Sequence, residues 1–94
     1  MEFEIRNIRL SDGTMPMTFD VRFDVLTLND LSLATLYGSP GAVFLRKPRL
    51  RHGERISAEI TRDAHAAIRD RAIAIYHDQT GMRLHAVHPS GAPV

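Results

Sequence analysis

The 94-residue sequence contains no cysteine. Without cysteine the chain cannot form disulfides or thiolate metal sites, and nothing marks it for an oxidising compartment. It also has no apolar run near the roughly 20 residues that a membrane-spanning helix needs. We therefore expect the fold to depend on hydrophobic packing, within one chain or between chains, and we expect no membrane partner.

The N-terminus has few features of a targeting segment. Met1–Ile5 combines two glutamates with isolated apolar residues, so it lacks both the basic start and the unbroken apolar stretch of a secretory signal. The sequence therefore predicts a cytoplasmic protein.

Motifs of catalysis are missing as well. The chain has no glycine-rich phosphate loop, no nucleophile elbow and no cysteine nucleophile. Asp20 and Asp24 are four residues apart on the polar side of a predicted strand, where solvated carboxylates are expected. We expect no enzyme activity, no catalytic residue, no cofactor and no small-molecule substrate.

Histidines near the C-terminus suggest a metal site, but their spacing fits no known ligand motif. We therefore predict no metal site. The residues considered are His77, His85 and His88, with Glu54, Asp63 or Asp78 as further ligands.

Length and composition indicate one domain. Hydrophobic residues make up 44% of the chain, which is enough for a core. A domain this small buries only about 60 to 65% of its unfolded surface and is marginally stable alone, which oligomerisation would relieve. We assign residues 1–78 to a single α+β domain and residues 79–94 to a C-terminal tail whose composition permits mobility.

The first half of the chain alternates as β-strands do. Residues 2–10 alternate with a phase slip near Arg6 and Asn7, which indicates a bulge, and a turn follows at residues 11–14. A second strand over residues 15–23 has the cleanest period-two pattern in the chain. Its apolar positions are Met15, Met17, Phe19, Val21 and Phe23.

The next segments are short and apolar. The leucines between Leu26 and Leu36 shift phase around Asn29 and Asp30, so the segment is either a helix or a bulged strand, and we favour the strand. A turn at residues 37–41 precedes a buried strand over residues 42–45. Pro48 cannot donate to a central ladder, so pairing is expected to stop near Lys47. A weak fifth strand is predicted at residues 56–60.

A helix is expected next, with Thr61 as its N-cap and Gly81 near its end. Ile73 and Tyr76 fall outside its predicted apolar stripe and need a second burial surface, such as a partner subunit, although single exposed apolar side chains are also ordinary. The predicted stripe is Ala64, Ile68, Ala72 and Ile75. The predicted fold is a twisted antiparallel sheet of four to five strands with one main C-terminal helix packed on it.

Basic residues are concentrated between residues 46 and 55. This segment contains five basic residues and one acidic residue, which give a local charge of +4. Residues 1–45 carry a net −3, and residues 56–94 are balanced. Such asymmetry favours an anionic partner, although basic residues also protect exposed strand edges from pairing. The basic cluster consists of Arg46, Lys47, Arg49, Arg51 and Arg55.

If the backbone stays extended, Lys47, Arg49 and Arg51 project from one side at about 7 Å intervals. That interval is close to the phosphate spacing along a nucleic-acid strand, so the three charges could follow a phosphate backbone.

The order of these elements resembles the SpoVG family of bacterial regulators over roughly residues 4–78. The matching pieces are Asn7–Leu10, Asn29–Leu33, Gly41–Pro48 and the helical stretch Ile60–Ile75 followed by Tyr76. The resemblance implies a small, dimeric nucleic-acid-binding protein with a twisted antiparallel sheet and one main C-terminal helix. On this alignment Arg51 holds the last basic position after the proline.

The sequence thus predicts a homodimeric regulator that binds DNA or RNA through a basic loop after the fourth strand. Lys47, Arg49 and Arg51 would be the main contacts, joined by Arg46 and Arg55. The alternative is a non-enzymatic protein-interaction module that docks an acidic partner or a neighbouring subunit through the basic loop and the helix.

Overall fold

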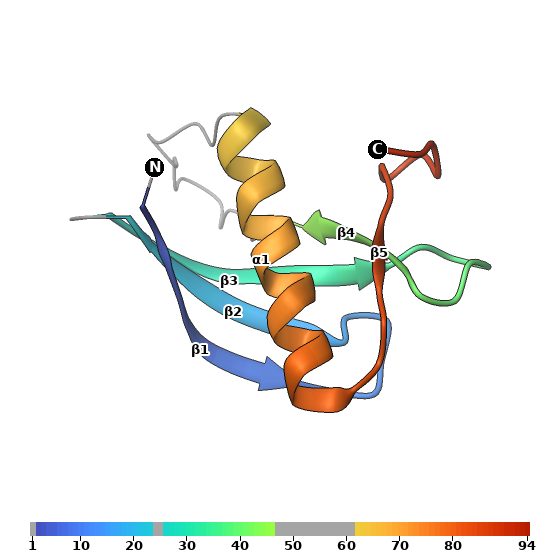
Figure 1. Ribbon diagram of the computed structural model, residues 1–94, viewed down its shortest axis with the longest axis horizontal. Coiled ribbons are helices and arrows are strands. Elements are labelled where there is room, and N and C mark those ends of the chain that lie inside the picture. Colours follow the sequence, from blue (N-terminus) through green and yellow to red (C-terminus); the bar gives the residue numbers. More distant parts are fainter. Residues whose placement is uncertain (1, 24–25, 47–61) are drawn as a thin grey trace, which may run out of the picture.

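The computed structural model describes residues 2–23, 26–46 and 62–94. Its elements are β1 (Glu4–Leu10), β2 (Met17–Phe23), β3 (Leu26–Thr35), β4 (Ala42–Arg46), α1 (Arg62–Thr80) and β5 (His85–Ala86). The strands form a sheet in the order β1-β2-β3-β4-β5, and α1 lies across one face of it (Figure 1). The predicted α+β class is confirmed.

The sheet is mixed, which corrects the prediction that all its strands are antiparallel. Pairings from β1 to β4 are antiparallel, whereas β4 and β5 run parallel. A parallel neighbour needs a long crossover, and α1 lies in the chain between these two strands. The predicted strand at residues 56–60 lies outside the described residues, and the fifth strand observed, β5, belongs to the segment predicted as a tail.

The core lies between α1 and one face of β2, β3 and β4. Alternation along β2 buries Met17, Phe19 and Val21 completely, as predicted. In β3 the buried leucines are Leu28, Leu31 and Leu33. Their change of parity coincides with a register shift against β2 between Phe19 and Val21, which confirms the bulged strand.

Helix α1 buries a stripe with a uniform spacing of four residues, Ala64, Ile68, Ala72 and Tyr76. The prediction that Ile75 continues the stripe and that Tyr76 lies outside it is therefore wrong. Each step of four residues turns the stripe by about 40°, so it winds slowly around the helix as it crosses the twisted sheet. Ile75 is half-buried, and Ile73 also packs partly against the core.

The end of α1 follows the prediction. Gly81 adopts a φ of 74°, and its N–H donates to the carbonyl of His77 at 2.8 Å. A left-handed glycine after the last turn closes the helix without the steric cost of a side chain. The predicted N-cap, Thr61, lies outside the described residues.

The C-terminal segment is attached to the sheet. The His85 N–H donates to the Gly41 carbonyl at 2.8 Å, and the Val87 N–H donates to the Val43 carbonyl at 2.9 Å. The chain then reverses, and Val87 forms a bridge with Pro93. The described part of the chain contains no helix that is both long and apolar enough to span a membrane.

The prediction that Asp20 is a solvated carboxylate is wrong, because the residue is only 7% exposed. It lies on the face of β2 opposite Phe19 and Val21, between two bulges. Asn7 in β1 and Asp30 in β3 both have left-handed backbones, with φ of 52° and 60°. Their hydrogen bonds to Asp20, described below, occupy its carboxylate.

Candidate functional site

The basic cluster is only partly described. Arg46 is exposed at the end of β4 and pairs with Ser32 of β3. Because neighbouring Leu45 is buried in the core, alternation directs Arg46 to the face of the sheet opposite α1. The other four predicted contacts lie outside the described residues: Lys47, Arg49, Arg51 and Arg55.

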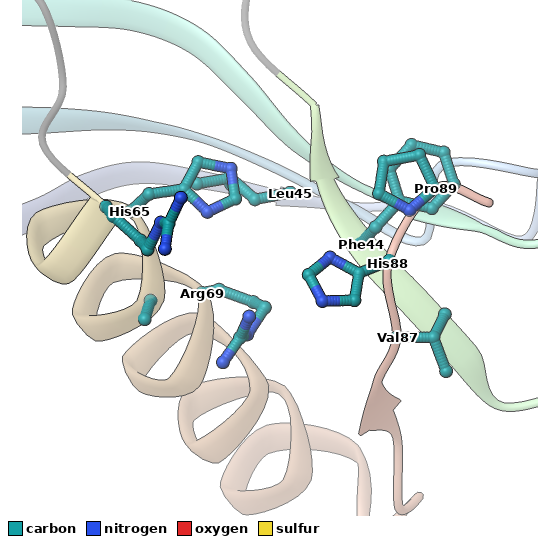
Figure 2. Close-up of a pocket in the computed structure, with 9 residues that line it drawn as sticks. Phe44, Leu45, His65, Arg69, Val87, His88 and Pro89 are labelled. Carbon is teal, nitrogen blue, oxygen red and sulfur yellow. The ribbon is translucent and has the colours of Figure 1, made fainter. Parts of the chain in front are cut away.

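A pocket lies beside β4, between that strand, the first half of α1 and the C-terminal segment (Figure 2). Its volume is about 420 Å³. Three separate parts of the chain therefore build one concave site. The lining residues are Phe44, Leu45, Arg62, His65, Ala66, Arg69, Val87, His88 and Pro89.

Basic side chains dominate the polar part of this pocket. Arg62, His65 and Arg69 are spaced three and four residues apart on α1, so they lie on one face of the helix. His88 comes from the C-terminal segment and extends into the space between it and α1 (Figure 2). No aspartate or glutamate is among the nine described lining residues. The pocket is therefore suited to an anionic group.

Arg69 is held in place at the helix surface. Its side chain is only 13% exposed, and its Nε donates to Asp70 Oδ1 at 3.0 Å. That bond uses one of the five N–H donors of the guanidinium group. The neighbouring carboxylate thus orients Arg69 and partly offsets its charge, while Asp70 itself is not a lining residue.

The opposite side of the pocket is apolar. Phe44 and Leu45 from β4, with Val87 and Pro89 from the C-terminal segment, form this wall. Phe44 is half-buried on the edge of the sheet, whereas Leu45 reaches into the core. The site therefore combines a cationic helical wall with an apolar wall.

Strand β4 extends beyond its neighbour at this site. Strand β5 pairs with Ala42 and Val43 only, so Phe44–Arg46 has no strand partner on that side within the described ranges. The Val43 carbonyl accepts a bond from Val87 on the β5 side. By the period of two, the backbone of Leu45 faces the same side. Polar backbone groups thus border the pocket.

The sequence predicted the basic cluster but missed this pocket. The spacing of Arg62, His65 and Arg69 on the expected helix was a usable signal. No sequence signal indicated that His88 contributes to the pocket, because residues 79–94 were predicted as a tail. Among the described residues no group of three or more potential metal ligands occurs.

No protein-family model, curated protein or solved structure matches this chain at a significant level.

Proposed function

We propose that this chain binds nucleic acid, DNA or RNA, through the basic cluster that begins at Arg46 and through the cationic wall of the pocket. The observation that carries the proposal is the pocket lining. It brings together two arginines and two histidines and, among the described lining residues, no carboxylate.

Chain connectivity supports joining the pocket to the basic cluster. Arg46 and Arg62 are the described residues on either side of residues 47–61. Arg62 and Leu45, the chain neighbour of Arg46, both line the pocket. Affinity would come mainly from neutralising phosphates with Lys47, Arg49 and Arg51. Such contacts position a ligand without reading its base sequence.

The resemblance to the SpoVG family belongs to the same proposal. Four strands followed by a long helix, in the predicted order, support it. The proposal therefore includes a homodimer and a cytoplasmic location. It also includes a regulatory role that needs neither a catalytic step nor a cofactor.

One observation that favoured the alternative role, a protein-docking module, no longer supports it. It relied on Ile73 and Tyr76 as apolar groups in need of a partner, and Tyr76 is only 7% exposed within the core of the chain. Ile73 also packs partly against that core. The charge asymmetry remains, and the basic pocket favours a phosphate-bearing ligand over an acidic protein surface.

The test is a fluorescence anisotropy titration with DNA and RNA probes, single-stranded and duplex, at two salt concentrations. Replacing Lys47, Arg49 and Arg51 together with alanine should lower the slope of log K against log salt by up to about 3, because up to three fewer counterions are released. Arg83→Ala is the control for the loss of one positive charge elsewhere, since Arg83 is exposed outside the cluster and the pocket.

Unchanged binding by the triple variant would exclude the cluster as the contact. An absence of binding to every probe at low salt would exclude nucleic acid as the ligand.

A further inference from the structure

The pocket beside β4 exists because the C-terminal segment separates from that strand. The carbonyls of Gly41 and Val43 accept ladder bonds at an interval of two residues, so the Leu45 carbonyl is the next acceptor and residue 89 the next donor. That residue is Pro89, which has no backbone N–H. The parallel ladder therefore ends at Val87, and a pocket of about 420 Å³ lies between β4, α1 and the C-terminal segment.

A turn holds His88 on one side of this pocket. Its backbone N–H donates to the Ala92 carbonyl at 2.9 Å, and its carbonyl accepts from the Gly91 N–H at 2.8 Å. The imidazole extends into the space between the C-terminal segment and α1 (Figure 2). Because both of its backbone groups are bonded, His88 is positioned opposite α1 before any ligand binds.

Two arginines of α1 line the other side of the pocket. Arg62 and Arg69 are seven residues apart, nearly two turns, so they lie on one face of the helix, with His65 between them. Guanidinium groups stay charged in proteins, and Arg69 keeps four N–H donors besides the one that bonds to Asp70. Donors therefore approach the pocket from two sides, and no carboxylate is among its described lining residues.

The charge and shape of the pocket favour one kind of phosphate. An internal phosphodiester of a nucleic acid carries one negative charge and has a sugar on either side. A phosphate monoester carries about −1.5 to −2 at pH 7, as in phosphoserine, and has three strong acceptor oxygens. The pocket volume falls within the range of about 300 to 1,000 Å³ that is typical of small-ligand sites. A concave site with several cationic donors is therefore better matched to a monoester.

We propose that the pocket binds a phosphate monoester, with its oxygens between Arg62 and Arg69 on α1 and His88 on the C-terminal segment. The monoester can come from two sources, the terminal phosphate of a nucleic-acid strand or a small phosphorylated molecule. The first source rests on the proposed function, because it names the group of the strand that enters the pocket, and the second source does not.

The first experiment titrates ¹⁵N-labelled wild type with methyl phosphate, a monoester, and with dimethyl phosphate, a diester, at equal ionic strength. Methyl phosphate should bind at least about fivefold more tightly, because its greater charge strengthens each hydrogen bond from a guanidinium group. The largest amide shifts should fall on Leu45, Ala66, Arg69 and His88, which line the pocket. Shifts confined to residues remote from the pocket would overturn the proposal.

The second experiment distinguishes the two sources by fluorescence anisotropy. One oligonucleotide is compared with a 5′-phosphate, with a 3′-phosphate and with no terminal phosphate. A strand end in the pocket should make one phosphorylated form bind at least about fivefold more tightly than the unphosphorylated form. Equal affinity of the three forms, together with saturable shifts from methyl phosphate, would assign the pocket to small phosphorylated molecules.

Variants of the helical wall test whether the monoester is bound in the pocket. Arg62→Gln and Arg69→Gln should each weaken binding of the preferred monoester about fivefold. Arg83→Gln makes the same change of charge at an exposed residue outside the pocket and should leave the affinity within about twofold of wild type. Arg62 is exposed, so its variant provides the test even if Arg69→Gln does not fold.

The outcomes separate this proposal from the proposed function. If methyl phosphate binds no more tightly than dimethyl phosphate and a terminal phosphate adds no affinity, the monoester site is excluded. Binding of the unphosphorylated oligonucleotide would then leave the proposed function intact. A preference for the monoester that is unchanged in Arg62→Gln and Arg69→Gln would place the site elsewhere and would also overturn the proposal.

Discussion

At the scale of single residues, Asp20 joins three strands through its carboxylate. The Asn7 side-chain amide donates to Asp20 Oδ2 at 2.7 Å, and the backbone N–H of Asp30 donates to Oδ1 at 3.0 Å. Arg9 lies 3.6 Å from the same carboxylate and 3.1 Å from that of Asp30. Both left-handed residues therefore bond to one charged group, which ties the two bulges together.

These contacts make stability depend on pH. Burial alone raises the pKa of Asp20, but the bond from Asn7, the bond from the Asp30 backbone and the nearby Arg9 charge together lower it below the ordinary value. A folded pKa below the unfolded one stabilises the protein above the unfolded pKa of about 3.9, and that contribution is lost as pH falls through the folded pKa.

We therefore predict that Asp20→Asn lowers the free energy of unfolding by about 1 to 3 kcal/mol at pH 7. The difference from wild type should shrink as the pH falls through the lowered, folded pKa of Asp20, because the wild-type carboxylate then becomes neutral as well. Urea denaturation at several pH values measures both effects. A difference that stays constant from pH 7 to pH 2 would contradict the role of the charge.

Two substitutions at Asn7 separate backbone strain from hydrogen bonding. Asn7→Gly keeps the left-handed backbone accessible and loses the bond to Asp20, whereas Asn7→Ala loses the bond and strains the backbone at φ 52°. We expect Asn7→Ala to be less stable than Asn7→Gly by about 1 kcal/mol in thermal unfolding. Equal stability would mean that the bulge relaxes in the variant.

At the scale of elements, Tyr76 fixes the last turns of α1 on the sheet. Its ring belongs to the core cluster, and its hydroxyl donates to the sulfur of Met82 at 4.0 Å. Tyr76→Ala should lower the free energy of unfolding by about 3 to 5 kcal/mol, as for other large aromatic truncations in cores. Tyr76→Phe should cost far less, since it removes only a weak bond to sulfur.

Ile75→Ala is the control for this prediction, because Ile75 is only half-buried. Chemical denaturation of the three variants should rank Tyr76→Ala as the least stable. An equal loss of unfolding free energy in Ile75→Ala would instead support the predicted apolar stripe, in which Ile75 takes the place of Tyr76.

Strand β5 should be a stable part of the sheet. The amides of His85 and Val87 donate to carbonyls at 2.8 and 2.9 Å, whereas Arg83 lies outside any strand. Hydrogen exchange should therefore be slower at His85 and Val87 than at Arg83. Equal exchange rates along residues 82–94 would instead agree with a mobile tail.

At the scale of the whole molecule, size and charge make an oligomer testable. A domain of 94 residues is marginal alone, and the proposed function includes a homodimer. Light scattering should give twice the chain mass at micromolar concentration, and the apparent melting temperature should rise with concentration, because folding and association are linked. A monomer at every concentration would contradict the dimer.

Much of this protein follows from its sequence alone. Period-two alternation in residues 17–23 and the phase shift at Asn29 and Asp30 depend on local geometry, so the strands and their bulges could be predicted. The extent of α1 and its glycine end are equally local. The charge asymmetry around residues 46–55 is a property of composition along the chain.

Contacts between distant residues required the tertiary structure. Alternation marked Asp20 as solvent-facing, whereas contacts with Asn7, Arg9 and Asp30 of the neighbouring strands occupy its carboxylate. Tyr76 lies in the core because the apolar stripe follows a twisted sheet, which helical spacing alone does not specify. Likewise the pocket exists because β5 returns parallel to β4 and places His88 beside α1. The sequence determined strands β1 to β4, helix α1 and the charge along the chain, whereas packing between remote segments determined β5 and the site.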